Sequence, residues 1–218
     1  MTATENERTQ QALRESEARF RNMANNAPVM VWMTKPDGTC VFLSDSWYNF
    51  TGQTPETGLG FGWLNAVHPK DREKTERVFL EASARVEPFR LDYRLRDKDG
   101  VYRWAIDSAR PRLSDTGEFL GYIGSVIDIT DLKQAEEALR ESEAKYRTLF
   151  NSIDEGFCIC EMLVDDHGQP YDYRFLETNP MFEPHTGLKD AVGKTVFELI
   201  PDLEPHWLRI YGRVALER

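Results

Sequence analysis

The sequence contains few cysteines, no excess of positive charge and no long apolar run. Its three cysteines, Cys40, Cys158 and Cys160, form no disulfide framework. No apolar stretch approaches the roughly 18 residues that a membrane-spanning helix needs, and the polar start MTATENERTQ lacks the apolar core of a secretory signal. A formal net charge of −10 argues against a nucleic-acid partner or an anionic lipid surface. We therefore expect a cytoplasmic chain with no membrane segment.

Signatures of common enzymes are also missing. The glycine-rich stretch at residues 58–62 follows a predicted helix rather than a strand, and it lacks the Lys-Ser/Thr pair of a phosphate-binding loop. No nucleophile elbow, metalloprotease helix or paired catalytic pattern occurs. Cys158 and Cys160 share one face of a predicted strand, but only His167 lies near them in the sequence, so we expect two buried thiols. The sequence predicts no catalytic residue and no metal ligand.

An internal repeat shows how the 218 residues are organised. Residues 12–21 read ALRESEARFR and residues 138–147 read ALRESEAKYR, so that eight of ten positions are identical at an offset of 126 residues. Thr51-Gly52 corresponds to Thr186-Gly187 further on, and Pro69 corresponds to Pro201. The chain therefore reads as a helix, a domain, a second helix and the beginning of the same domain again.

The region between the two helices predicts an α+β domain of about 100 residues. A hairpin at 29–44 turns at 35–38, short helices follow up to residue 67, and an amphipathic helix covers 70–84. Three strands are then expected at 89–96, 101–113 and 119–130. The last strand is apolar on both faces, which predicts a central position in the sheet with its outer face covered by the first helix or by a second subunit.

The second helix, at residues 131–150, has alternating charges and a narrow apolar seam. That pattern favours a two-stranded coiled coil, and hence a homodimer through the helices, although Ser142 in the seam leaves an exposed monomeric helix as the alternative. The predicted dimer seam consists of Leu132, Ala135, Leu139, Tyr146 and Leu149.

Several stretches resemble the PAS/PAC sensory family, of the type called PAS fold 3, as found in bacterial sensor histidine kinases. They are FLSDSWYNFTG at 42–52, GWLNAVHPKDR at 62–72, YRLRDKDGVYRW at 93–104 and DIT at 128–130. The resemblance implies a five-stranded antiparallel sheet with short helices on one face. It divides the chain into an N-terminal helix (1–27), a PAS/PAC domain (28–130), a signalling helix (131–150) and a truncated second PAS domain (151–218).

The resemblance implies a sensory input module, most simply the input region of a sensor histidine kinase in a two-component phosphorelay. Its signal would leave through Asp128 and Thr130 into the signalling helix. The phosphorylated histidine and the ATP-binding boxes of such a kinase are absent, so any kinase activity would belong to residues beyond Arg218. A ligand-free dimerisation scaffold and the input module of a cyclic-dinucleotide enzyme are the alternatives.

The same resemblance indicates a pocket for a small-molecule ligand, although the aromatic residues concerned could simply fill the core. Flavin-binding relatives use a cysteine before the long helix, where residues 60–67 have none. Haem-binding relatives use a histidine in or near that helix; residues 70–84 have none, His68 lies in a turn, and His206 belongs to the second copy. Both cofactors are therefore disfavoured, and the ligand is not identified. The candidate pocket residues are Trp32, Trp47, Phe50, Trp63 and Phe79.

Overall fold

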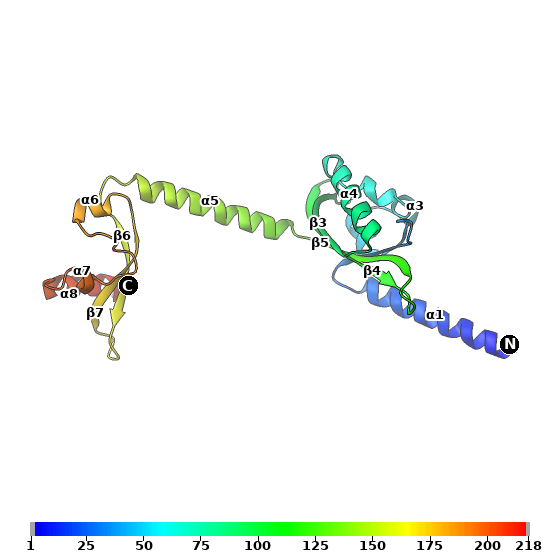
Figure 1. Ribbon diagram of the computed structural model, residues 1–218, viewed down its shortest axis with the longest axis horizontal. Coiled ribbons are helices and arrows are strands. Elements are labelled where there is room, and N and C mark those ends of the chain that lie inside the picture. Colours follow the sequence, from blue (N-terminus) through cyan, green and yellow to red (C-terminus); the bar gives the residue numbers. More distant parts are fainter. Residues whose placement is uncertain (1–2, 217–218) are drawn as a thin grey trace. The chain divides into compact units, whose positions relative to one another are not determined.

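The computed structural model describes residues 3–216, and these divide between Glu136 and Glu137 into two compact units (Figure 1). The first unit contains a five-stranded antiparallel sheet in the order β2-β1-β5-β4-β3. This order confirms the predicted α+β class, and it places β5 in the centre, beside β1. The strands are β1 (Met30–Thr34), β2 (Cys40–Leu43), β3 (Phe89–Arg96), β4 (Tyr102–Leu113) and β5 (Phe119–Asp128).

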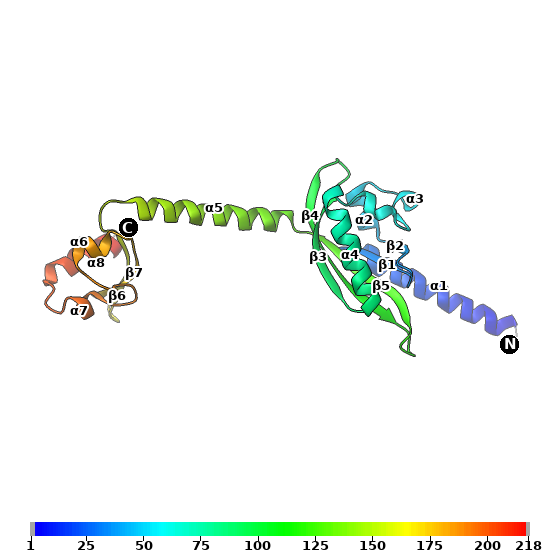
Figure 2. The same ribbon diagram turned by 45° about the horizontal axis from the view of Figure 1, so that its top comes forward.

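Helices cover one face of this sheet, and α4 lies across it in both ribbon views (Figure 2). The predicted helix near residues 63–67 is a 3-10 turn. Helix α2 ends at Gly52, whose φ of 71° is a conformation that glycine adopts without strain. Helix α4 begins with Pro69, a residue that is favoured at the first helical position. The covering elements are α2 (Asp45–Thr51), α3 (Pro55–Gly58), η1 (Gly62–Asn65) and α4 (Pro69–Arg85).

The core of the first unit lies between α4 and the inner face of the sheet. Val78 and Phe79 of α4 pack inward against it, as the amphipathic pattern predicts. Burial alternates along β3: Leu91, Tyr93 and Leu95 are buried, and the residues between them are half-buried. The largest side chains that are almost completely buried here are Trp47, Tyr93, Tyr122, Leu95, Val67 and Val126.

The outer face of the sheet is only partly covered. Ile127 is 44% exposed, so the structure does not show the complete cover that the apolar pattern of 119–130 predicts. The N-terminal helix α1 (Ala3–Asn25) contacts the edge of the sheet instead, where the ring of Phe20 lies 5.2 Å from that of Phe42. At the start of β5, Phe119 packs against Tyr122 on the core side, because β5 pairs irregularly with β4 there.

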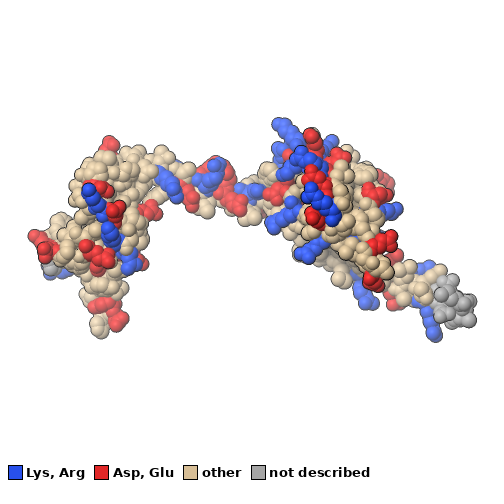
Figure 3. Space-filling view, in the orientation of Figure 1, with Lys and Arg blue, Asp and Glu red and all other residues tan. Residues whose placement is uncertain are grey.

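Helix α5 (Thr130–Ser152) is continuous and almost entirely exposed. It begins one residue before and ends two residues after the predicted 131–150. Figure 3 shows Lys and Arg interspersed with Asp and Glu along it. Among the helices described, none combines the length with the apolar character needed to span a bilayer.

The second unit repeats the opening of the first. Its hairpin is followed by a short helix that ends at Gly187 (φ 76°), as α2 ends at Gly52. The long helix begins at Pro205, so the structural counterpart of Pro69 is Pro205, and Pro201 lies in the preceding turn. The buried core here is Phe175, Phe182, Ala191 and Val196. The elements are β6 (Cys158–Val164), β7 (Pro170–Thr178), α6 (Phe182–Thr186), α7 (Val196–Leu199) and α8 (Pro205–Leu216).

Candidate functional site

A small internal cavity lies between α4 and the sheet of the first unit. Its volume is about 20 Å³, which is enough for one water molecule and too small for a drug-sized ligand. Four of the five aromatic residues predicted to line a pocket border it, and Phe50 instead packs against the surrounding core. The lining residues are Trp32, Thr34, Cys40, Leu43, Trp47, Trp63, Thr75, Phe79, Phe89, Leu91, Tyr93 and Asp107.

Asp107 is the one charged side chain in this lining, and it is buried. The indole Nε1 of Trp32 donates to Oδ1 of Asp107 at 2.9 Å, and the hydroxyl of Tyr93 lies 3.4 Å from Oδ2. Burial raises the pKa of Asp107 to about 7, although these two hydrogen bonds oppose that shift. The cavity therefore contains a carboxyl group whose pKa lies well above the ordinary value of an aspartate.

Asp107 is not among the site residues predicted from the sequence. Its signal lies in the alternation of β4, where Ala105 and Ala109 are buried and Asp107 lies between them on the same face. A carboxylate at an inward-facing position of a strand is rare enough to mark a site.

Asp128 and Thr130 connect the sheet to α5. Oδ1 of Asp128 accepts from the backbone N–H of Thr130 and Oδ2 accepts from Nη1 of Arg103, both at 2.9 Å. The hydroxyl of Thr130 accepts from the N–H of Trp104, also at 2.9 Å. Partial burial raises the pKa of Asp128, but the hydrogen bonds from Thr130 and Arg103 outweigh it and leave that pKa below its ordinary value.

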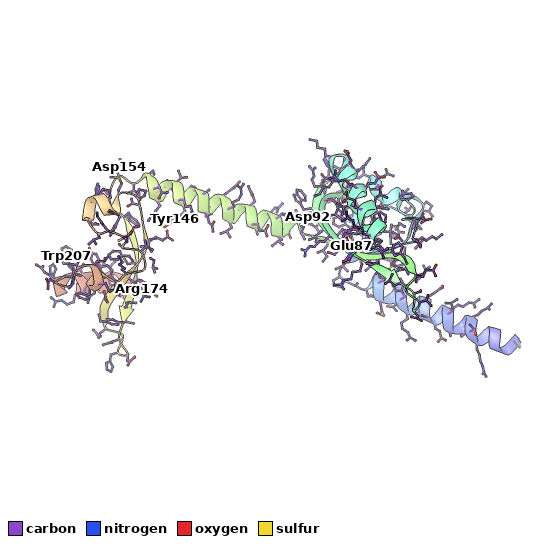
Figure 4. All side chains as sticks on the ribbon, in the orientation of Figure 1. Glu87, Asp92, Tyr146, Asp154, Arg174 and Trp207 are labelled. Atoms are coloured by element: carbon purple, nitrogen blue, oxygen red, sulfur yellow. The ribbon has the colours of Figure 1, made fainter. Side chains whose placement is uncertain are left out.

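A second set of contacts ties the first turn of α5 to the sheet around Trp104. Nζ of Lys133 lies 3.3 Å from Oδ2 of Asp92, which Figure 4 labels, and 5.5 Å from the centre of the Trp104 ring. The guanidinium of Arg94 lies 5.8 Å from the same ring. Trp104 is 38% exposed, so its ring lies at the surface beneath these two cations.

Arg94 links this surface to the helix that covers the cavity. Its side chain donates twice to the carboxylate of Asp71 in the first turn of α4, at 2.8 and 2.7 Å. These hydrogen bonds lower the pKa of Asp71 to about 2. Thr75, one turn further along α4, borders the cavity. The first turns of α4 and the contacts of Arg94 and Trp104 therefore connect the cavity wall to the first turn of α5.

In the single chain, the residues of the predicted dimer seam lie on the surface of α5. Leu132, Leu139 and Leu149 are each more than half exposed, and Ala135 is also exposed. Tyr146 differs, because its hydroxyl donates to Glu177 at 3.0 Å and its ring stacks on Phe150. Four apolar seam residues are therefore available to a partner helix.

The histidines considered for haem have local partners. Nδ1 of His68 accepts from the N–H of Lys70 at the start of α4, and Nδ1 of His206 lies 3.0 Å from a carboxylate oxygen of Glu204. The expectation of two buried thiols in the second unit is wrong, because Cys160 is exposed and Cys158 only half-buried. The edge position of β6 in a two-stranded sheet leaves these side chains open to solvent.

Two family profiles match the chain. The profile of the PAS fold matches residues 40–126, and a PAS domain profile matches residues 144–216. The uncharacterized protein y4lL of Sinorhizobium fredii is 49% identical over 127 residues, which are 58% of this chain and 15% of that protein. The peroxide stress-activated histidine kinase mak1 of Schizosaccharomyces pombe is 29% identical over 153 residues, 66% of this chain and 9% of the kinase.

Two further matches are a curated enzyme and a solved structure. The probable diguanylate cyclase DgcE of Escherichia coli is 31% identical over 102 residues, 47% of this chain and 9% of that enzyme. A solved sensory box histidine kinase/response regulator from Burkholderia thailandensis shares 26% identity at a TM-score of 0.41, covering 60% of this chain and 98% of that structure. The chain thus spans only 9% to 15% of the length of these three curated relatives.

Proposed function

The chain belongs to the PAS domain family, and on that premise we propose that it is the cytoplasmic input region of a sensor histidine kinase in a two-component phosphorelay. It is a PAS sensory module homologous to parts of histidine kinases and of a diguanylate cyclase. In this proposal the first domain senses the signal, α5 transmits it, and the second PAS domain receives it. The kinase reaction itself belongs to other parts of the parent protein.

The input site is the cavity between α4 and the sheet. Its aromatic walls and single carboxyl would hold a small ligand, and a ligand larger than one water molecule would have to push α4 away from the sheet. Thr75 and Phe79 border the cavity from α4, so such a displacement moves this helix directly. Binding energy is thereby converted into a shift of α4.

The observation that carries the proposal is the joint between β5 and α5. Asp128 bonds both to Arg103 of β4 and to the first N–H of α5, while Thr130 bonds back to Trp104. A change in the spacing of β4 and β5 cannot leave all of these hydrogen bonds intact, because they weaken steeply with distance and angle. We expect the first turn of α5 to reorient with the sheet.

The output would be a change in helix pairing. The exposed residues Leu132, Ala135, Leu139 and Leu149 form the seam of a homodimer in this proposal. Reorienting the first turn of α5 would change how two such helices meet, and a paired helix can carry that change into the next domain.

Two other functions have an observation in their favour. The cavity of about 20 Å³ favours a ligand-free dimerisation scaffold, because a core this well filled needs no ligand. The 31% identity to a probable diguanylate cyclase favours a cyclic-dinucleotide enzyme as the parent protein. The kinase proposal rests on the larger share of this chain matched by mak1.

The test uses the purified 218-residue chain and a library of small metabolites. A sensor predicts at least one compound that raises the melting temperature, with the rise lost in a variant carrying Trp47→Ala at the cavity wall. The matched control is Trp207→Ala in the second unit, which should keep the rise. A chain that dimerises but shows no such response to any compound would support the scaffold instead.

A further inference from the structure

Two cysteines of the second unit lie next to each other on β6. Cys158 and Cys160 are separated by one residue, so their side chains point to the same face of the strand, and both border one open groove. Their Sγ atoms lie 3.6 Å apart, with the S–H of Cys160 donating to Cys158. The equivalent strand of the first unit, β1, contains no cysteine. This pair of thiols therefore belongs to the second unit alone.

Both thiols of the pair can be reached from solvent. Cys160 is exposed, and Cys158 is half-buried in the wall of the groove. The third cysteine differs, because Cys40 is buried in the core of the first unit and its S–H donates to the carbonyl of Phe42 at 3.4 Å. Burial also raises the pKa of Cys40 to about 11. The chain therefore has one accessible pair of thiols and one thiol that solvent hardly reaches.

The hydrogen bond between the two sulfur atoms gives them different roles. It lowers the pKa of Cys158 to about 7, below the ordinary value of 9.0, and it raises the pKa of Cys160. The thiolate is the nucleophilic form of cysteine, and a thiol whose pKa lies near the ambient pH attacks fastest. Cys158 is thus the attacking sulfur, and Cys160 lies one hydrogen bond away from any product formed on it.

We propose that Cys158 and Cys160 form a site of reversible oxidation by hydrogen peroxide. The thiolate of Cys158 attacks one peroxide oxygen, the O–O bond breaks, and Cys158 becomes a sulfenic acid while the other oxygen takes a proton from solvent and leaves as water. The sulfur of Cys160 then attacks that of Cys158, the S–O bond breaks, and the leaving hydroxide takes the proton of Cys160 to form a second water. The dithiol gives two electrons to the peroxide and becomes a disulfide. This site lies in the second domain and does not depend on what the first domain senses.

The backbone spacing allows this disulfide and makes it easy to reduce. Residues two positions apart on a strand have Cα atoms about 6.4–6.8 Å apart, at the upper end of the range that a disulfide bridges. Strand β6 belongs to a two-stranded sheet and pairs irregularly with β7 beside Cys160, so it can bend to close the bond. A strained and exposed disulfide is readily reduced. A dithiol reductant should therefore restore both thiols.

The test exposes the reduced 218-residue chain to a small excess of hydrogen peroxide and locates the oxidised sulfur atoms by peptide mass mapping. We expect a Cys158–Cys160 disulfide within one chain, which dithiothreitol reverses. Cys158 should be oxidised at least about ten-fold faster than Cys40, because a buried thiol that stays protonated is inert. This comparison uses the parent chain, so the result does not depend on whether a variant folds.

Variants then separate the two steps. Cys160→Ser removes the second thiol, so the sulfenic acid of Cys158 should accumulate and react with the sulfenic-acid probe dimedone. Cys158→Ser should slow the oxidation of the chain by at least about ten-fold. Cys40→Ala is the matched control in the first unit and should leave the rate and the disulfide unchanged. Equal oxidation rates of Cys40 and Cys158 in the parent chain would overturn the proposal, as would disulfides that form only between chains or sulfinic acid without any disulfide.

Discussion

The indole of Trp32 reaches over Gly124 to donate a hydrogen bond to Asp107 at 2.9 Å. Trp32 lies on β1 and Asp107 on β4, with β5 between them, and Trp32 is paired directly with Gly124. A Cβ atom at position 124 would lie 2.4 Å from the indole ring, closer than such atoms approach each other. The hydrogen bond that fixes the cavity carboxyl therefore depends on a glycine in the central strand.

We expect Gly124→Ala to displace the indole and break its bond to Asp107. The free energy of unfolding of the first unit should fall by about 1–3 kcal/mol, the usual cost of overpacking a core. Urea unfolding followed by tryptophan fluorescence measures this, in a Trp207→Phe background so that every indole reports on the first unit.

The control is Ser125→Ala, which changes the neighbouring residue on the outer face of β5, where the side chain is only half-buried. Its unfolding midpoint should stay near that of the parent chain. Equal stability of Gly124→Ala and the parent would show that the indole can move aside without loss.

The charge of Asp107 should make the stability of the first unit depend on pH. Its folded pKa of about 7 lies above the ordinary value of 3.8, so the folded state binds more protons between these values. The contribution of Asp107 to stability is then largest below pH 4, falls as pH rises towards 7 and stays low above it. Asp107→Asn resembles the protonated acid and should remove this fall.

The difference in unfolding free energy between Asp107→Asn and the parent chain should grow by about 2 kcal/mol between pH 5 and pH 8. Urea titrations at several pH values measure it. Asp115→Asn, in the exposed turn before β5, is the control and should follow the parent chain throughout. Parallel curves for Asp107→Asn and the parent would contradict a raised pKa.

Sequence patterns predicted much of this architecture because periodicity reports burial directly. The alternation of polar and apolar residues at 89–96 correctly indicates which face of β3 is buried. The apolar residues on both faces of 119–130 correctly predict that β5 is central in the sheet. The repeat at residues 12–21 and 138–147 predicts that the second unit begins with the same order of helices and strands as the first. The irregularity at the start of β5 was not predicted, because the position of Phe119 depends on pairing with β4 and not on the apolar pattern of β5 itself.

The candidate site was predicted less completely. Aromatic residues marked the walls of the cavity, but its size depends on how side chains from several elements meet, which no single segment encodes. The inward position of Asp107 could have been predicted from the sequence, because it lies between two alanines on the same face of the strand. The series from Asp71 through Arg94 to Trp104 was not, since it joins residues from α4, β3 and β4 that only the folded sheet brings together.

The seam of α5 predicts a specific oligomeric state. Leu139 is 62% exposed in the single chain, and a partner helix would bury it. Leu139→Glu should therefore convert a dimer into a monomer, as measured by light scattering of the 218-residue chain. Gln134→Glu adds the same charge away from the seam and should leave the dimer intact. A dimer that persists in Leu139→Glu would place the interface elsewhere.

Removing the carboxylate of Asp128 should loosen the start of α5. Asp128→Ala leaves Arg103 without this partner and removes the acceptor for the N–H of Thr130. We expect a loss of about 1 kcal/mol in unfolding free energy, since the ion pair is partly exposed. Amide exchange in the first turn of α5 should accelerate, while Asp115→Ala leaves it unchanged. An unaltered exchange rate there would show that the helix start is held by other contacts.

We infer that the joint at Asp128 carries the state of the cavity into α5. Amide hydrogen exchange of the 218-residue chain near pH 8 tests it directly, because Asp107 is mostly ionised at that pH whereas the amide introduced by Asp107→Asn is neutral. We expect Asp107→Asn to change the exchange of residues 131–137, and this change to disappear when Asp128→Ala is added. Identical exchange of residues 131–137 in the parent chain and in Asp107→Asn would contradict it.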